Sequence, residues 1–223
     1  EMCIRDRVWL VLLFGLFGCL KFGAVHGVLY NSAQLRAAYP NPALAKTVTV
    51  NLTVFDSIDS KTFTGFNKTW YVTLVNCVKL TELPLNLLAP LTQLVMFTAN
   101  NCKLNKLKAG VFAYPKLNSF GQLFLTDNNI TTVDKSAFNL PKLWKLDLSG
   151  NKNLKLAANM FKGVAAKLQV LTLQQIGLSQ LDASLSYFVG LQSLVTLDLG
   201  KNLIRSLNET AFDQDLSGLK KLV

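Results

Sequence analysis

Leucine or a similar apolar residue recurs at a nearly constant spacing along most of the chain. Three places after each of these residues comes a second marked position, which holds cysteine, asparagine or isoleucine. Successive members of this second series are 25, 26, 23, 25 and 26 residues apart. A period of this length indicates a solenoid in which each repeat forms one turn of a coil. The two series are Leu74, Ala99, Leu125, Leu148, Leu173 and Leu199, and Cys77, Cys102, Asn128, Asn151, Ile176 and Asn202.

Each repeat contains a short segment of alternating apolar and polar residues, which predicts a β-strand. Side chains alternate between the two faces of a strand, so the outer two residues would point into the coil and the middle one out of it. Stacked turns would bring the strands side by side in one parallel sheet. The predicted strand cores are residues 72–74, 97–99, 123–125, 146–148, 171–173 and 197–199.

Two further positions in each repeat have a structural explanation. A buried asparagine amide both donates and accepts hydrogen bonds, so it can bind backbone groups of its own turn and of the next one. Ile176 would interrupt this ladder and leave backbone groups in need of another partner. A large apolar residue follows 10–12 places later, and we expect it to fill the space behind the sheet. These residues are Leu88, Phe112, Phe138, Phe161, Phe188 and Phe212.

The skeleton L-x-x-L-x-L-x-x-N/C-x-L and its aromatic position resemble the typical leucine-rich repeats of extracellular receptors and matrix proteins. The resemblance covers residues 69–223 and implies a right-handed α/β solenoid, a horseshoe with a parallel β-sheet on its concave face. We assign six repeats and the start of a seventh to residues 67–223. Residues 219–223 match residues 191–195, the segment that leads into the preceding strand. We therefore expect the sequence to stop before its next strand and to be a fragment.

Residues 28–66 do not follow the repeat pattern and predict an N-terminal cap unit. Residues 32–38 suit a short helix, which Pro40 and Pro42 would end. Residues 48–54 alternate between apolar and polar and predict a strand. We expect this unit to cover the apolar edge of the first repeat by packing alone.

The first 27 residues predict a secretory signal peptide. Arg5 and Arg7 precede an apolar run over residues 8–20, and small residues suitable for cleavage follow it. The run is shorter than the roughly 20 residues that a membrane-spanning helix needs, and an uncleaved signal anchor is the alternative. Residues 1–6 read as the translation of a sequencing adapter and are left out of the fold prediction.

The chemistry of the chain gives no support to catalysis or metal binding. The chain's one histidine, His26, lies in the predicted signal peptide. Asp147 and Asp198 take equivalent places two turns apart, too far from each other to share a proton. We therefore expect no enzyme, cofactor or metal site in this fragment. The net charge is +10, but the lysines are scattered along the chain, so we do not expect a nucleic-acid partner.

The two cysteines of the repeats occupy the same place in neighbouring turns. We expect Cys77 and Cys102 to be buried thiols, because side chains stacked in parallel suit the geometry of a disulfide poorly; a bridge is the alternative. Asn-x-Thr sequences mark potential glycosylation sites on exposed loops of a secreted protein. These are Asn51, which falls in the predicted cap strand and is therefore the weakest, and Asn67, Asn129 and Asn208.

Outward-facing residues of the predicted sheet are the candidates for ligand binding, because exposed aromatic residues are favoured at binding hot spots. The alternative for the first two members of this set is that they pack against the cap. The candidates are Trp70, Tyr71, Met96, Gln122, Phe124, Trp144, Lys145, Asp147, Gln174 and Asp198.

These features predict a secreted or cell-surface module that binds a protein, peptide or glycan on its concave face. We expect it to belong to a receptor ectodomain, with membrane attachment through a missing C-terminal segment. A secreted inhibitor or matrix protein is one alternative. The ectodomain of a receptor-like kinase whose kinase domain is missing is another. A cytosolic scaffold would require that residues 1–27 are not a signal peptide.

Overall fold

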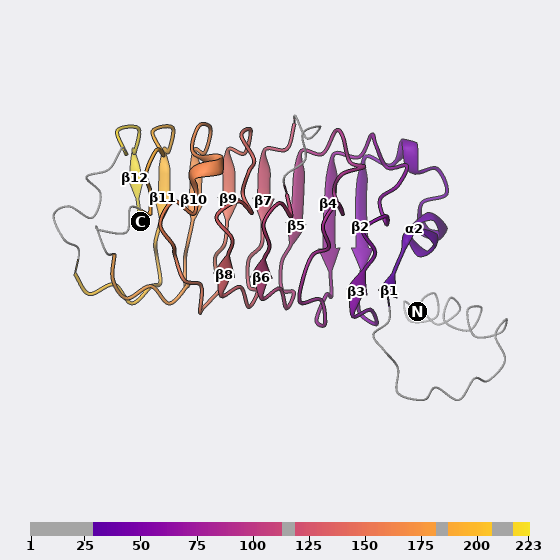
Figure 1. Cartoon of the computed structure of the whole chain (residues 1–223), viewed down its shortest axis with the longest axis horizontal. Helices are drawn as coiled ribbons and strands as arrows, with labels where there is room; N and C mark the ends of the chain where they lie inside the picture. The colour runs from indigo at the N-terminus through magenta and orange to yellow at the C-terminus, as the bar shows by residue number, and fades with distance from the viewer. Residues whose placement is uncertain (1–28, 113–118, 182–186, 207–215) are drawn as a thin grey trace, which may run out of the picture.

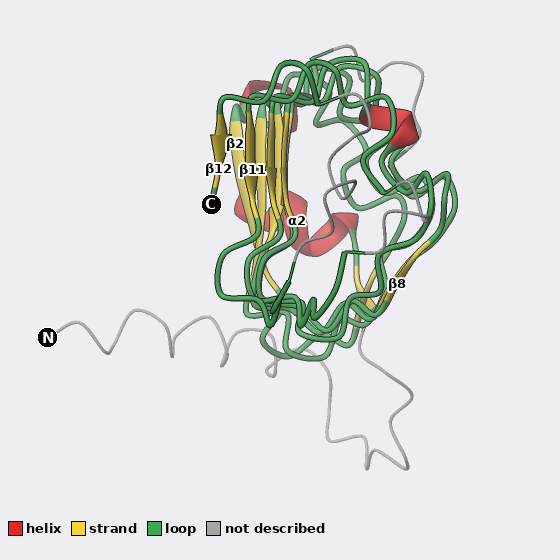
Figure 2. Cartoon of the chain, turned by 90° about the vertical axis from the view of Figure 1, so that its left-hand side faces the viewer, coloured by secondary structure: helices red, strands yellow, loops and turns green. Residues whose placement is uncertain are grey.

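The computed structural model describes residues 29–112, 119–181, 187–206 and 216–223. The chain winds into an elongated coil, and each turn adds one strand to a parallel sheet along one side (Figure 1). Seen along the coil, the strands line one side, and loops with short helical turns form the return side opposite (Figure 2). The predicted signal peptide, Asn208 and Phe212 lie outside the described residues. Within the described part, no helix is long and apolar enough to cross a membrane.

The main sheet has eight parallel strands in the order β12-β11-β10-β9-β7-β5-β4-β2. Their register places equivalent leucines of successive repeats side by side, such as Leu123 beside Leu146 and Leu146 beside Leu171. The predicted solenoid is therefore confirmed. The strands are β2 (Thr47–Asn51), β4 (Tyr71–Val75), β5 (Met96–Ala99), β7 (Gln122–Phe124), β9 (Lys145–Asp147), β10 (Val170–Thr172), β11 (Thr196–Asp198) and β12 (Lys221–Leu222).

The return side is made mostly of turns, with few helices. The two-residue strands β6 (Lys106–Leu107) and β8 (Thr132–Val133) pair there, and the 3-10 turn η2 spans Lys162–Val164. The predicted aromatic row packs behind the sheet. Phe112, Phe138, Phe161 and Phe188 stack in sequence, with centroids 6.5, 6.4 and 6.4 Å apart.

The predicted asparagine ladder joins neighbouring turns. Asn151 is fully buried; its Nδ2 donates to the carbonyls of Leu125 in the preceding turn (3.0 Å) and Leu148 in its own turn (2.7 Å). Its Oδ1 accepts the N–H of Ile130 at 3.0 Å. Asn128 and Asn202 make equivalent bonds. Where Ile176 stands, the carbonyls of Leu148 and Leu173 each keep one amide partner, Asn151 and Asn202.

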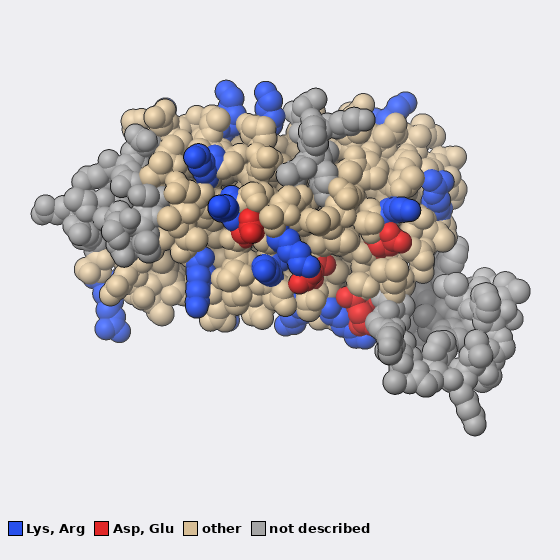
Figure 3. Space-filling view, in the orientation of Figure 1, with Lys and Arg blue, Asp and Glu red and all other residues tan. Residues whose placement is uncertain are grey.

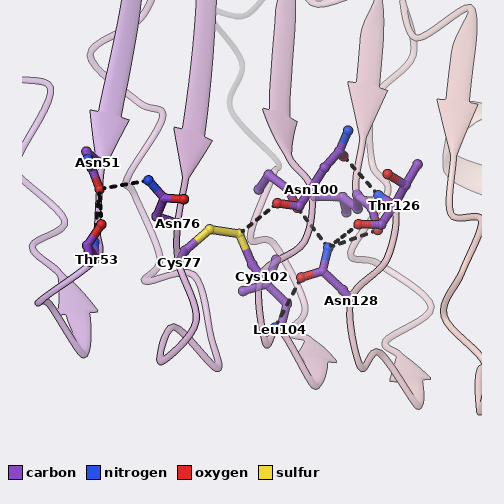
Figure 4. The surroundings of a disulfide bond; sticks show 11 residues. Asn51, Thr53, Asn76, Cys77, Asn100, Cys102, Leu104, Thr126 and Asn128 are labelled. Atoms are coloured by element: carbon purple, nitrogen blue, oxygen red, sulfur yellow. Dashed lines mark hydrogen bonds between the residues drawn. A yellow bond between two sulfur atoms is a disulfide. The ribbon is translucent and has the colours of Figure 1, made fainter. Parts of the chain in front are cut away.

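The prediction of two free thiols is wrong, because Cys77 and Cys102 form a disulfide between neighbouring turns (Figure 4). Their Cα atoms are 4.6 Å apart, within the range that a disulfide spans. Both residues lie beyond the ends of β4 and β5, each after an asparagine in the left-handed conformation (Asn76, φ 56°; Asn101, φ 53°). The pleat of the strands therefore does not fix the direction of the two side chains.

The N-terminal unit forms a full turn of the coil. The predicted helix is confirmed as α2 (Ser32–Ala38), whose N-cap Asn31 makes a capping box with Gln34. The 3-10 turn η1 (Pro42–Leu44) follows, and β1 (Leu29–Tyr30) pairs with β3 (Ser57–Ile58). The predicted strand is shorter than expected, since Val54 lies beyond β2 and is 57% exposed. Because β2 pairs with β4, the unit extends the main sheet.

The C-terminal register differs from the sequence prediction by three residues. We expected the sequence to stop before its next strand, but β12 pairs with β11, with Leu222 beside Leu197. Leu222 therefore corresponds to Leu197 and not to Leu194. The error arises because leucines three residues apart (Leu191, Leu194, Leu197) make the repeat resemble itself after a shift of three.

Candidate functional site

The predicted binding residues lie on the outward side of the main sheet, called here the sheet face. The strand register brings Tyr71, Met96, Gln122 and Lys145 side by side, one on each of four neighbouring strands. Phe124 lies beside Asp147 one step further along the strands. Trp70 and Trp144 directly precede β4 and β9, Gln174 follows β10, and Asp198 ends β11.

Trp144 is the most exposed of the predicted residues in the middle of this face, at 38%. Its indole lies across the backbone of Gly121 in the preceding turn. A Cβ atom on Gly121 would come within 2.7 Å of the indole Nε1, so a larger residue there would displace the Trp144 side chain. The repeat pattern alone does not predict this contact, because it lies between turns.

Lys145, which follows Trp144 in the sequence, contacts Phe124 in the preceding turn. The ammonium of Lys145 lies 5.2 Å from the centroid of the Phe124 ring, a favourable cation–π distance. Both residues are half-buried in the sheet face. The contact keeps the Phe124 ring on a surface that is otherwise open, where a partner could cover it.

Trp70 lies against the N-terminal unit, as the alternative interpretation proposed, and is still 41% exposed. Its indole N–H donates to Gln93 Oε1 at 3.2 Å, and Lys46 Nζ lies 4.5 Å from the ring centroid. These two contacts link the Trp70 side chain to the turns before and after its own. Tyr71, its neighbour, is 36% exposed.

The acidic residues of the sheet face help to close the turns after the strands. Asp147 Oδ1 accepts the N–H of Ser149 (3.0 Å), and Asp198 Oδ1 accepts the N–H of Gly200 (2.9 Å). Asp198 Oδ2 also accepts a hydrogen bond from Gln174 Nε2 at 2.6 Å. Asp147, Gln174 and Asp198 therefore make hydrogen bonds within the protein, at the edge of the sheet face where the strands end.

Two lysines on the other edge of the face were not among the predicted residues. Lys142 and Lys167 precede β9 and β10 by the same number of residues, and with Trp144 and Gln169 they line an open hollow of about 420 Å³. A signal was present in the sequence, because Lys167 follows Lys142 by one repeat period.

Among the described residues, the two groups with a displaced pKa lie away from the sheet face. Burial, with a smaller effect from Tyr39, raises the pKa of Tyr30 in β1 to about 12. Hydrogen bonds from the backbone and hydroxyl of Ser136 lower the pKa of Asp134, which follows β8. In the described part of the chain, no group of three or more His, Cys, Asp or Glu side chains could hold a metal ion.

Three of the predicted glycosylation sites fall on described residues, and all three asparagines are exposed. Asn51 ends β2, and its Oδ1 accepts hydrogen bonds from the N–H and hydroxyl of Thr53 (3.0 and 2.6 Å) and from Asn76 (3.3 Å; Figure 4). Asn67 lies in the turn before β4, and Asn129 follows the buried Asn128. Attachment of a glycan at these sites stays a prediction.

Comparison with known proteins finds relatives with repeats of the same kind. The leucine rich repeat family matches residues 121–177. Toll-like receptor 3 of Bos taurus is 31% identical over 176 residues, which are 75% of this chain and 18% of the receptor. Transforming growth factor beta activator LRRC32 of Pongo abelii is 37% identical over 86 residues, which are 39% of this chain and 13% of the relative. The chain thus spans less than a fifth of the length of these curated relatives.

Solved structures share the fold. TLR13, in a crystal structure of its complex with ssRNA13, matches with a TM-score of 0.59 and 18% identity, over 88% of this chain and 34% of that one. Human 5T4, also called Wnt-activated inhibitory factor 1, matches with a TM-score of 0.54 and 24% identity, over 73% of this chain and 60% of that one. At these identities the likeness concerns the fold alone.

Proposed function

Because this chain is a leucine-rich repeat protein that resembles the ectodomains of leucine-rich repeat receptors, we propose that it is an extracellular, non-catalytic recognition module that binds its partner on the sheet face. The partner is a protein, peptide or glycan. The observation that carries the proposal is the group of Phe124, Trp144 and Lys145, which puts two aromatic rings and a cation on an open surface.

The sheet supports binding by its rigidity. Backbone hydrogen bonds join each strand to the strands beside it, and Leu123, Leu146 and Leu171 beneath the middle of the sheet are fully buried. The candidate side chains project from this sheet, so a partner would order few groups on binding, which lowers the entropic cost of association. Trp144 also belongs to a residue type that is enriched at binding hot spots.

The disulfide supports an extracellular location. Disulfides persist in oxidising compartments and are rare in the cytosol, and Cys77–Cys102 is buried within the core of this protein. Together with the relatives, this favours a secreted or cell-surface protein over the cytosolic scaffold. Anchoring in a membrane through a further segment is part of the same proposal.

We expect removal of the aromatic side chains to abolish binding without unfolding the protein. In a Phe124→Ala/Trp144→Ala variant, binding to the members of an array of purified extracellular proteins and glycans that the wild type recognises should fall at least tenfold. Thermal unfolding should change little, since both side chains lie on the surface. Leu85→Ala, at an exposed leucine on the return side, is the matched control. Equal binding by the double variant, or no binding by the wild type, would contradict the proposal.

Glycans are expected on the exposed asparagines when the protein passes through a eukaryotic secretory pathway. Treatment with an N-glycosidase should lower the apparent mass of the secreted protein. Asn67→Gln and Asn129→Gln should each remove one glycan, whereas Asn105→Gln, an exposed asparagine outside any Asn-x-Thr sequence, should remove none. Secreted protein whose mass does not change on treatment would show that these sites are unoccupied.

A further inference from the structure

Positive charge gathers along one edge of the main sheet, where the chain leads into the strands. Several of the described segments that lead into the main-sheet strands carry lysine, and none of the described residues that directly precede these strands is acidic. This lysine rim consists of Lys46, Lys68, Lys142, Lys167 and Lys220, which precede strands, and of Lys145 and Lys221, the first residues of β9 and β12. The return side, seen in Figure 3, carries Lys or Arg at its upper edge, while its acidic side chains lie lower and among basic ones.

The opposite edge of the sheet carries both signs of charge. Asp147 and Asp198 lie at the C-terminal ends of β9 and β11, and the described salt bridges, Lys79–Asp56 and Lys108–Glu82, lie beyond the strand ends. The sheet face is therefore polarised along the strands, from basic at the rim to mixed charge at the other edge. Neighbouring strands are only about 4.8 Å apart, well within the Debye length of roughly 8 Å, so the fields of rim lysines on adjacent turns add.

The positive charge of the rim is most concentrated beside Trp144. The pairing of β9 with β10 sets Trp144 beside Gln169 and Lys142 beside Lys167, and these four residues line the open hollow. Neither Lys142 nor Lys167 pairs with an acidic side chain in the part of the chain that the structure describes. Two unneutralised ammonium groups thus flank an exposed indole.

We propose that the partner of the sheet face is a protein that presents an acidic segment to this rim. Its carboxylates would lie on Lys142 and Lys167, and an apolar side chain of the same segment would cover Trp144. This inference rests on the proposed function, and it adds the chemistry of the partner and the edge at which it docks.

The charge pattern favours a short acidic segment over a uniformly charged polymer. The lead-in segments of β5 and β11 contain no lysine, so the rim is interrupted and does not form a continuous basic track. A polyanion lying along the strands would reach Asp147 and Asp198 at their C-terminal ends. A segment with a few carboxylates beside an apolar side chain avoids both, and its charges complement the polarised face.

Charge reversal at the hollow tests the proposal. The probe is a synthetic peptide in which glutamates alternate with leucines, and a lysine–leucine peptide of equal length is its negative control. The acidic peptide should bind the wild type more weakly as salt rises. Lys142→Glu/Lys167→Glu should weaken its binding at least tenfold, and Trp144→Ala should weaken it as well. Lys103→Glu/Lys152→Glu, with the same net charge but on the opposite edge, should bind like the wild type.

Three results would overturn the inference. The acidic peptide does not bind the wild type, or both charge-reversal variants lose binding equally, or heparin or single-stranded RNA of matched charge binds the same lysines more tightly than the peptide. Failure of this inference can be told apart from failure of the proposed function. If the binding of array partners is lost in Phe124→Ala/Trp144→Ala but is insensitive to salt and to Lys142→Glu/Lys167→Glu, the sheet face binds and only its acidic partner is refuted. If that binding survives in Phe124→Ala/Trp144→Ala, the proposed function itself fails.

Discussion

Replacement of Phe138 by alanine is expected to lower the free energy of unfolding by about 4 kcal/mol, the usual cost of emptying a phenylalanine site in a core. Phe138 is fully buried and stacks against Phe112 and Phe161 at 6.5 and 6.4 Å. The cavity would therefore open between two turns and weaken the contact on both sides.

Urea unfolding followed by circular dichroism measures this change. Because a solenoid is held by contacts between neighbouring turns, we also expect the transition to broaden. Trp144→Ala, which removes an exposed ring of greater size, should cost less than about 1 kcal/mol. A loss for Phe138→Ala no larger than that of Trp144→Ala would show that the aromatic row does not support the sheet.

Loss of the disulfide should destabilise the first turns by about 3.5 kcal/mol. The bridge closes a loop with a sequence separation of 25 residues, and the chain-entropy model gives this magnitude for such a loop. Reduction of the wild type with dithiothreitol should therefore lower the midpoint of urea unfolding. Alanine suits the replacement of both cysteines, because serine hydroxyls would be buried at these sites.

The double variant Cys77→Ala/Cys102→Ala separates the bridge from other effects of the reductant. It should resemble the reduced wild type and show no further change on reduction. When the protein is unfolded and alkylated without prior reduction, mass spectrometry should find neither Cys77 nor Cys102 alkylated. If the wild type is alkylated at Cys77 and Cys102, or if reduction leaves its midpoint unchanged, the bridge does not form in solution.

The repeat pattern was sufficient to predict the coil and the sheet, because both follow from local periodicity. The strand cores, the buried asparagines and the stacked phenylalanines all lie where a single spacing of about two dozen residues puts them. The register of the last turn was wrong because leucines three residues apart give two similar alignments. The repeat period separates them, since Leu222 follows Leu197 by 25 residues and Leu194 by 28, and the strand pairing of Leu197 with Leu222 agrees with the shorter step.

The candidate site was predicted less completely, for a different physical reason. An alternating strand pattern shows which side chains face outward, so Phe124, Lys145 and Trp144 could be named. What surrounds them depends on contacts between turns. The place of Trp144 over Gly121, the hollow between Lys142 and Lys167, and the bridge from Cys77 to Cys102 all join residues of neighbouring turns. No single repeat contains these pairs.

Ile176 gives the coil one joint unlike its neighbours. All other adjoining turns between those of Cys77 and Asn202 are linked at the equivalent position. The link is either the disulfide or an asparagine amide that donates to a carbonyl of the preceding turn. Between the turns of Asn151 and Ile176 the described residues contain no such link. The pairing of β9 with β10 and the hydrogen bond from the Gln174 N–H to Ser149 Oγ still join these turns, so the sheet face stays continuous from Trp144 to Asp198 although one amide link of the ladder is missing.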